Sequence, residues 1–413
     1  MKKGAKKSAL YLLLSKNKDA LFDKNILIVS GENPRGATVF KDLQLSPPTE
    51  EVEFIVLWKI YILVIVCHEM RDFNVNGADV IDVYKTLEDV KLLDTELNLS
   101  GLLREAQRFA KRLVKPSNVE FGLQLDPVYG LPAGLIGRIY LEEPESDLRN
   151  KGVNSIDGMF TKVNSALVKS GYTIWVLLDR LDVAFAESHE LEANAIRALL
   201  RVYGDLRSSD HIALKIFLRE DIWKRVTSSG FREASHITRF EIMRWTTPML
   251  LNLTIRRILS NDALNNELHI DKDEILLDSK KQQEIFNRIF PKQVDQGSRK
   301  AATFDWMVGR CADASGMTAP RELIHLLNCI RDEEIRRLER EESPAPEEQL
   351  FDRSVFKQAL PIVSETRQNT YLYAEYPGEK FFVEKFQGEK AEQTPESLSD
   401  IWSMSRYSSI AKS

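Results

Sequence analysis

The sequence predicts an α/β protein: a parallel sheet with flanking helices, followed by an all-helical domain. Between Ser155 and Trp245, helical segments alternate with short, uniformly apolar segments, which is typical of a parallel sheet covered on both faces. Beyond Trp245, nearly every segment has the apolar spacing of an amphipathic helix. The 413 residues, 43% hydrophobic and 29% charged, suffice for two or three folded domains.

The amino-terminal region is predicted to form a helix and then a strand. The segment SALYLLLSKNKDALF places its large apolar residues on one helical face, and NILIVS has the pattern of a buried strand. A helical insertion is expected over about 50–115. It opens with the apolar run 54–67, which contains Lys59 and is shorter than the roughly 20 residues of a membrane span. We therefore expect a buried helix and no membrane association.

The central region carries the remaining predicted strands. A small hairpin region is expected over 118–143, and a helix over 155–170. The next segments are the strand TIWVLL, a helix from about Glu190 to Leu206, the strand IALKIFL, the short helix DIWKRV and the segment HITRFEI. Residues 1–245 are therefore assigned to one α/β domain.

The rest of the chain is divided by composition. We expect a helical domain over 246–340, a linker over 341–350, and a helical extension over 351–413. Within the extension, ESLSDIWSMS resembles the first helix of a winged-helix domain, but too little sequence follows it to complete one. This end suggests a truncated gene product.

Charge and cysteine content narrow the function classes. The formal net charge is −5, so no whole-chain basic field attracts nucleic acid, and nucleic-acid binding is not expected. The three cysteines lack CxxC spacing, which indicates neither a disulfide framework nor a zinc site. We expect a cytoplasmic protein.

The strongest chemical signal is TIWVLLDRLD, which has the pattern of a Walker B strand. Asp179 would stand at the carboxyl end of a parallel strand, where ligands bind in open α/β sheets and a carboxylate can hold Mg²⁺ beside phosphates. Asp182, Glu187 or Glu190 could polarise an attacking water. Acidic residues after a strand also commonly cap the next helix.

Two segments compete as the phosphate loop. In MKKGAKKS, Lys7 and Ser8 form the Lys-Ser end of the motif, and Gly4 is its one glycine, but Met1 and Lys6 replace both motif glycines. In GENPRGAT, residues 31–38, both glycines are kept, but Ala37 stands where the lysine belongs. Because a motif glycine lets backbone N–H groups approach phosphates, Lys6 should weaken binding.

Several arginines are candidates for contacting phosphates. Arg219 follows the strand IALKIFL, and Arg321 begins a helix in TAPREL. A guanidinium suits developing phosphate charge, although a surface pair with a nearby carboxylate explains either residue equally well. Arg232 and Arg239 are weaker candidates for an arginine finger acting on another copy, and His236 is expected to be structural.

In this order, KKGAKKSALYLLL, DRLDVAF, LKIFLREDIWKRV, FREASHITR and TAPRELIHLLN resemble an uncharacterised bacterial P-loop ATPase family near the STAND, KAP and AAA-type ATPases. The resemblance runs from residue 1 to about residue 399. It implies a P-loop NTPase-like sheet and a helical lid, with ATP and Mg²⁺ as cofactors. It also favours MKKGAKKS as the phosphate loop.

The resemblance assigns roles to individual residues. Lys7 would bind the β- and γ-phosphates, Ser8 and Asp179 would hold Mg²⁺, Arg219 would be sensor-like, and Arg321 would be the second sensor. Two departures are Lys6 in place of glycine and a chain that begins inside the loop, without the preceding strand. Both ends together suggest a truncated gene product or a mis-set start codon.

The expected function is a conformational switch driven by ATP hydrolysis, with weak or absent turnover. A protein partner or homo-oligomer would fit such a switch. The rival prediction, from a different class, is a non-catalytic interaction protein that keeps the fold as a scaffold.

Overall fold

The structure, a computed structural model, divides into two compact units, Met1–Met243 and Arg244–Ser413. Each unit has its own hydrophobic core. The residues that the structure describes are 7–33, 38–44, 47–48, 50–93, 98–114, 135–136, 138–141, 146, 152–181, 188–228, 230–269, 271–313, 315–343, 345, 349–375, 377–390 and 392–410.

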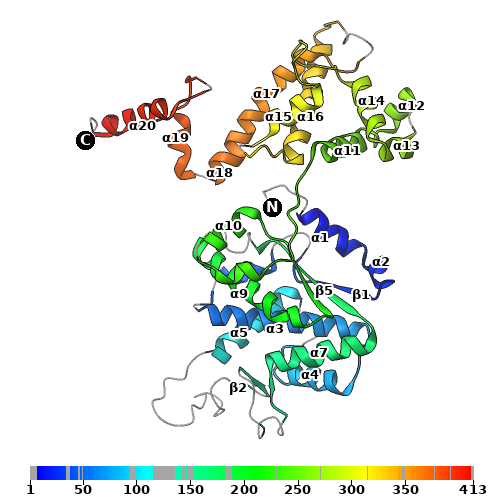
Figure 1. Ribbon diagram of the computed structural model, residues 1–413, viewed down its shortest axis with the longest axis vertical. Helices are drawn as coiled ribbons and strands as arrows, with labels where there is room; N and C mark the ends of the chain where they lie inside the picture. The colour runs from blue at the N-terminus through cyan, green and yellow to red at the C-terminus, as the bar shows by residue number, and fades with distance from the viewer. Residues whose placement is uncertain are drawn as a thin grey trace. The chain divides into compact units, whose positions relative to one another are not determined.

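The first unit is an α/β unit, as the sequence predicts (Figure 1). Its α-helices are α1 (Lys7–Lys16), α2 (Lys18–Phe22), α3 (Glu51–Asp72), α4 (Ala78–Asp89), α5 (Leu99–Val114), α7 (Ile156–Ser170), α9 (His189–Asp205) and α10 (Glu220–Ser228). Its strands are β1 (Ile26–Ser30), β2 (Leu135–Ile136), β3 (Ile139–Tyr140), β4 (Asn154–Ser155), β5 (Thr173–Leu178) and β6 (Ile212–Ile216), and its 3₁₀ turns are η1 (Val39–Gln44), η2 (Leu206–Ser208) and η3 (Arg232–His236).

The main sheet is parallel and has the order β1-β5-β6. Ser30 pairs with Leu177, and Leu178 pairs with Ile216, so all three strands end at one edge of the sheet. The residues just beyond the strands therefore meet there. This edge holds Glu32 after β1 and Asp179 after β5.

Both faces of this sheet are covered, which explains why its strands are mostly apolar. Leu27 and Val176 belong to the large core on the face that α3, α7 and α9 cover. Ile28 and Leu177 alternate with them and pack with Tyr11 and Phe217 on the other face. Figure 1 shows α1 and α2 on one side of β1 and β5, with α3 and α7 on the other.

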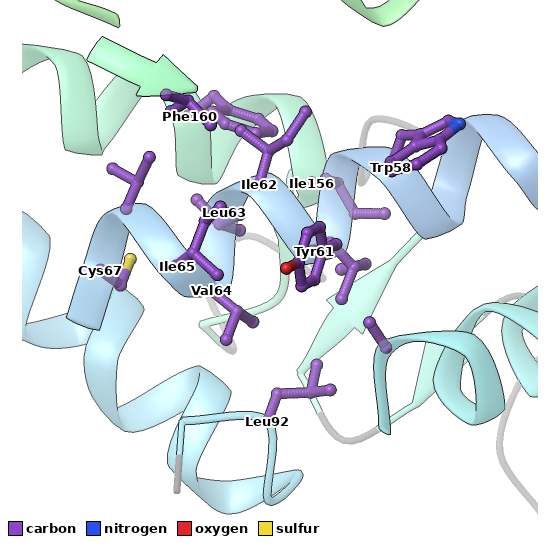
Figure 2. Close-up of a cluster of buried hydrophobic side chains, with 14 of the residues drawn as sticks. Trp58, Tyr61, Ile62, Leu63, Val64, Ile65, Cys67, Leu92, Ile156 and Phe160 are labelled. Atoms are coloured by element: carbon purple, nitrogen blue, oxygen red, sulfur yellow. The ribbon is translucent and has the colours of Figure 1, made fainter. Parts of the chain in front are cut away.

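Helix α3 is the centre of the larger core, and the predicted buried helix is confirmed. Ile60 to Val66 are each almost fully buried, and Figure 2 shows Ile62 next to Phe160, with Val64 on the side of the helix toward Leu92. Lys59 can stand within the apolar run because two carboxylates neutralise its charge: the ammonium group lies 2.8 Å from Asp157 and 2.9 Å from Asp205. Within the described ranges, no helix is both long and apolar enough to cross a bilayer.

Two further segments of the central region have different outcomes. The hairpin predicted over 118–143 is seen as the antiparallel pair β2 and β3, to which β4 adds in parallel, while 118–134, 137 and 142–143 lie outside the described residues. The segment HITRFEI, to which the sequence assigns no element, has no regular structure over 237–242. Its large side chains Phe240 and Ile242 are exposed, and the Phe240 ring lies 6.1 Å from the Trp223 ring.

The second unit contains helices and one isolated bridge among its described residues. The helices are α11 (Thr247–Ile258), α12 (Asp262–Leu268), α13 (Lys272–Leu277), α14 (Ser279–Ile289), α15 (Thr303–Cys311), α16 (Pro320–Glu339), α17 (Arg353–Arg367), α18 (Tyr373–Glu375), α19 (Lys380–Glu384) and α20 (Pro395–Ile410), with the π-helical turn η5 (Gln368–Leu372) and the 3₁₀ turn η6 (Pro377–Glu379). Helix α17 packs on α16, and Phe356 shares one core with Leu326. The segment predicted as a linker over 341–350 therefore does not separate two cores.

Candidate functional site

The first turn of α1 positions two of the predicted site residues. The helix begins at Lys7, and Ser8 follows. Tyr11 and its neighbours Leu10 and Leu14 fix the helix on the sheet by packing with Ile28 and Leu177. The amino terminus of α1 is thereby held above the carboxyl edge of the sheet.

Asp179 lies at that edge, immediately after β5, and is 1% exposed. The Lys7 Nζ atom is 2.9 Å from Asp179 Oδ1. The Ser8 hydroxyl donates a hydrogen bond of 2.9 Å to Asp179 Oδ2. The structure therefore brings together the three residues that the sequence proposed as a Lys-Ser pair and a Walker B carboxylate.

The backbone next to Asp179 also contacts its carboxylate. The Arg180 N–H donates to Asp179 Oδ1 at 2.7 Å. Arg180 has a φ of 60°, in the left-handed region that side chains rarely adopt. Both oxygens of the Asp179 carboxylate are therefore oriented by donors from Lys7, Ser8 and Arg180. Such contacts compensate a buried charged group for the water that it has lost.

This cluster has the chemistry of a phosphate and magnesium site. The first N–H groups of a helix lack partners within the helix and carry partial positive charge, to which Lys7 adds a full charge. The Asp179 carboxylate and the Ser8 hydroxyl are oxygen donors of the kind that Mg²⁺ prefers, and Mg²⁺ commonly takes one or two protein ligands together with substrate phosphates. Among the described residues, no group of three or more His, Cys, Asp or Glu that could hold a metal ion occurs.

The competing loop GENPRGAT has a different role at the same edge. Gly31 packs closely against β5, because a Cβ atom there would lie 2.6 Å from Leu178 Cδ2 and force that side chain to shift. The Thr38 hydroxyl, which the motif would use for a metal, donates to Glu32 Oε2 at 2.6 Å. Residues 34–37 lie outside the described part of the chain. The contacts at both ends of this loop thus favour MKKGAKKS.

Glu32 is a functional candidate that the sequence prediction missed. Its side chain is fully buried, and burial raises the pKa of its carboxyl, although hydrogen bonds from Thr38 and Val39 and the charge of Arg180 act in the opposite direction. The signal was present, because Glu32 is also an acidic residue directly after an apolar strand. The segment 31–38 that contains it is considered above only as a candidate phosphate loop.

Other predicted residues lie in several places. Gly4, Lys6, Asp182 and Glu187 are outside the described residues, and Glu190 is exposed in the first turn of α9.

The candidate arginines have partners of their own. The Arg219 guanidinium contacts Asp221 at 2.6 Å. Arg321 belongs to the second unit, where its Nε lies 3.1 Å from Glu322 and its guanidinium stands over the Tyr371 ring.

The weaker candidates lie near the end of the first unit. Arg232 and His236 are in the exposed turn η3, and the His236 carbonyl accepts a hydrogen bond from Arg207. Arg239 is near enough to Lys215 that burial and the Arg239 charge together lower the Lys215 pKa.

No protein-family model, no curated protein and no solved structure matches this chain.

Proposed function

We propose that this chain binds Mg²⁺–ATP at the cluster of Lys7, Ser8 and Asp179, as a P-loop ATPase-like protein. One observation carries the proposal: a lysine and a serine in the first turn of a helix both contact a buried carboxylate at the carboxyl end of a parallel strand. Lysine for phosphate, and hydroxyl plus carboxylate for Mg²⁺, are the parts that phosphoryl-transfer sites of this kind combine.

The three side chains would exchange partners when nucleotide binds. The Lys7 ammonium would leave the Asp179 carboxylate for phosphate oxygens, and Ser8 and Asp179 would hold Mg²⁺. Each charge keeps an opposite charge beside it, so no side chain is left as an uncompensated buried ion. Mg²⁺, when bound, would neutralise phosphate charge.

We expect hydrolysis to be slow. Lys6 stands where a glycine would let the backbone approach the phosphates. Because the lysine side chain hinders that approach, fewer backbone N–H groups can reach the transition state. Arg219, in the same unit as the cluster, is proposed to supply a guanidinium group to the phosphates. Measuring the binding of Mg²⁺–ATP is therefore a better test of the proposed function than measuring its turnover.

Calorimetric titration with Mg²⁺–ATP tests the proposal. We expect a dissociation constant of about 1 μM in the wild type. Lys7→Met should weaken it at least about tenfold, because a charge-assisted phosphate contact is lost. Lys16→Met is the matched control: it removes an exposed lysine at the other end of α1 and should bind as the wild type does.

A second candidate is a non-catalytic interaction protein. The observation in its favour is the segment 237–242, which lies outside regular structure and in which Phe240 and Ile242 are 58% and 43% exposed. Large apolar side chains exposed close together are typical of a surface that another protein covers. If the wild type shows no binding of Mg²⁺–ATP, this candidate replaces the first.

A further inference from the structure

Glu32 is a second acidic residue at the carboxyl edge of the sheet, and the proposed site does not use it. It stands two residues beyond Ser30, just as Asp179 stands two residues beyond Leu177, the strand partner of Ser30. The two residues are therefore neighbours across the sheet edge. Keeping a fully buried carboxylate ionised costs free energy, so the contacts of the Glu32 carboxylate must compensate for that cost.

One set of contacts closes the loop between β1 and η1. Glu32 Oε1 accepts hydrogen bonds from the backbone N–H groups of Asn33 at 2.9 Å and Val39 at 3.1 Å. Glu32 Oε2 accepts from the Thr38 hydroxyl at 2.6 Å and from the Val39 N–H at 3.2 Å. These bonds explain a structural role for Glu32 in the loop.

A second set of contacts connects Glu32 to the proposed site without involving the loop between β1 and η1. Arg180 Nη1 lies 4.0 Å from Glu32 Oε1, and the Arg180 N–H orients Asp179 Oδ1. The left-handed conformation of Arg180 is unfavourable for a residue with a side chain, so the surroundings must stabilise it. The Glu32 carbonyl also accepts a hydrogen bond from Tyr11, on the helix that carries Lys7 and Ser8.

We propose that Glu32 is a positioning residue, which orients the Asp179 carboxylate toward the metal by holding the Arg180 side chain in place. This inference rests on the proposed function and specifies how the metal side of that site is built. Groups that orient a metal ligand without touching the metal commonly change metal affinity by about 10- to 100-fold when they are altered.

The test compares three variants. Glu32→Gln removes the charge that attracts Arg180. Thr38→Val removes a loop contact of Glu32 and leaves the Arg180 pair intact. Glu192→Gln is the matched control. Glu192, on α9, is also a buried glutamate, and it pairs with Arg225 on α10 of the same unit.

Two quantities are measured for each variant: the exchange rate of the Arg180 amide hydrogen by NMR, and ATP affinity with and without Mg²⁺. We expect Glu32→Gln to speed Arg180 exchange and to weaken Mg²⁺–ATP binding about tenfold. Its affinity for ATP without Mg²⁺ should be unchanged, because Lys7 is untouched. Thr38→Val and Glu192→Gln should leave Arg180 exchange and the Mg²⁺ dependence at wild-type values.

The positioning role is overturned if a folded Glu32→Gln protein keeps wild-type Arg180 exchange, or if Thr38→Val reproduces its effects. A wild type that binds no Mg²⁺–ATP removes the proposed function, and Arg180 exchange then decides the positioning role alone. Should Glu32→Gln fail to fold, Arg180→Gln replaces it. That variant removes the other member of the pair and must show the same selective loss of Mg²⁺-dependent affinity or, without nucleotide binding, weaker protection of the amide at position 180.

Discussion

Glu32 shows how burial changes the behaviour of a single residue. Burial raises its pKa above the usual 4.5, so the folded chain binds this proton more tightly than the unfolded chain does. Between the unfolded and the folded pKa, the folded state holds more protons, and stability falls as pH rises through that window.

The first prediction concerns this residue. From pH 4.5 upward, the unfolding free energy of the wild type should fall relative to that of Glu32→Gln, because glutamine has no proton to lose. Urea unfolding of both proteins over a pH series measures the difference. Two curves that stay parallel from pH 4 to pH 8 would contradict it.

The same edge shows what a sequence can predict at the scale of residues. Asp179 was predicted because it ends an apolar strand, and both Lys7 and Ser8 were predicted from the end of a motif. Their contact is a consequence of folding, since 171 residues separate Ser8 from Asp179. Glu32 was missed because its role depends on Arg180 and Val39, partners that no local pattern identifies.

At the scale of elements, α3 combines two kinds of burial. Ile62 is surrounded by other apolar side chains, whereas Lys59 ends at two carboxylates whose side chains remain 63% and 51% exposed. Burial acts to lower the pKa of Lys59, but the two carboxylates outweigh it and the pKa is raised.

The two positions should therefore respond differently to substitution. Ile62→Ala should cost about 2–5 kcal/mol, because it leaves a cavity in the core. Lys59→Met keeps the apolar stem, and water can hydrate the freed carboxylates, so its cost should stay below about 1 kcal/mol. Denaturant unfolding measures both. A larger loss for Lys59→Met than for Ile62→Ala would show that the ion pairs dominate.

The elements that the sequence predicts correctly are those whose own residues are apolar enough to require burial. The apolar run of α3 and the mostly apolar strand β5 are stable only where a core covers them. The residues of HITRFEI do not by themselves fix its conformation, because the pairing of a strand is decided by distant parts of the chain.

At the scale of the whole molecule, two cores with no residue in common stabilise the two units. Phe356→Ala, in the core of the second unit, should cost that unit about 3–5 kcal/mol. Hydrogen exchange followed by mass spectrometry should show lower protection within 244–410 and unchanged protection in α3 and β5. Equal losses in both units would contradict separate cores.

The central claim is that Asp179 and Ser8 hold the metal of a bound nucleotide. Mn²⁺ is a spectroscopic substitute for Mg²⁺ at such oxygen sites, so electron paramagnetic resonance of Mn²⁺–ATP tests the claim directly. We predict one immobilised Mn²⁺ per chain, with affinity at least about tenfold weaker in Asp179→Asn, because the anionic ligand is lost. Equal Mn²⁺–ATP affinity in the two proteins, or no immobilised Mn²⁺ in the wild type, would contradict it.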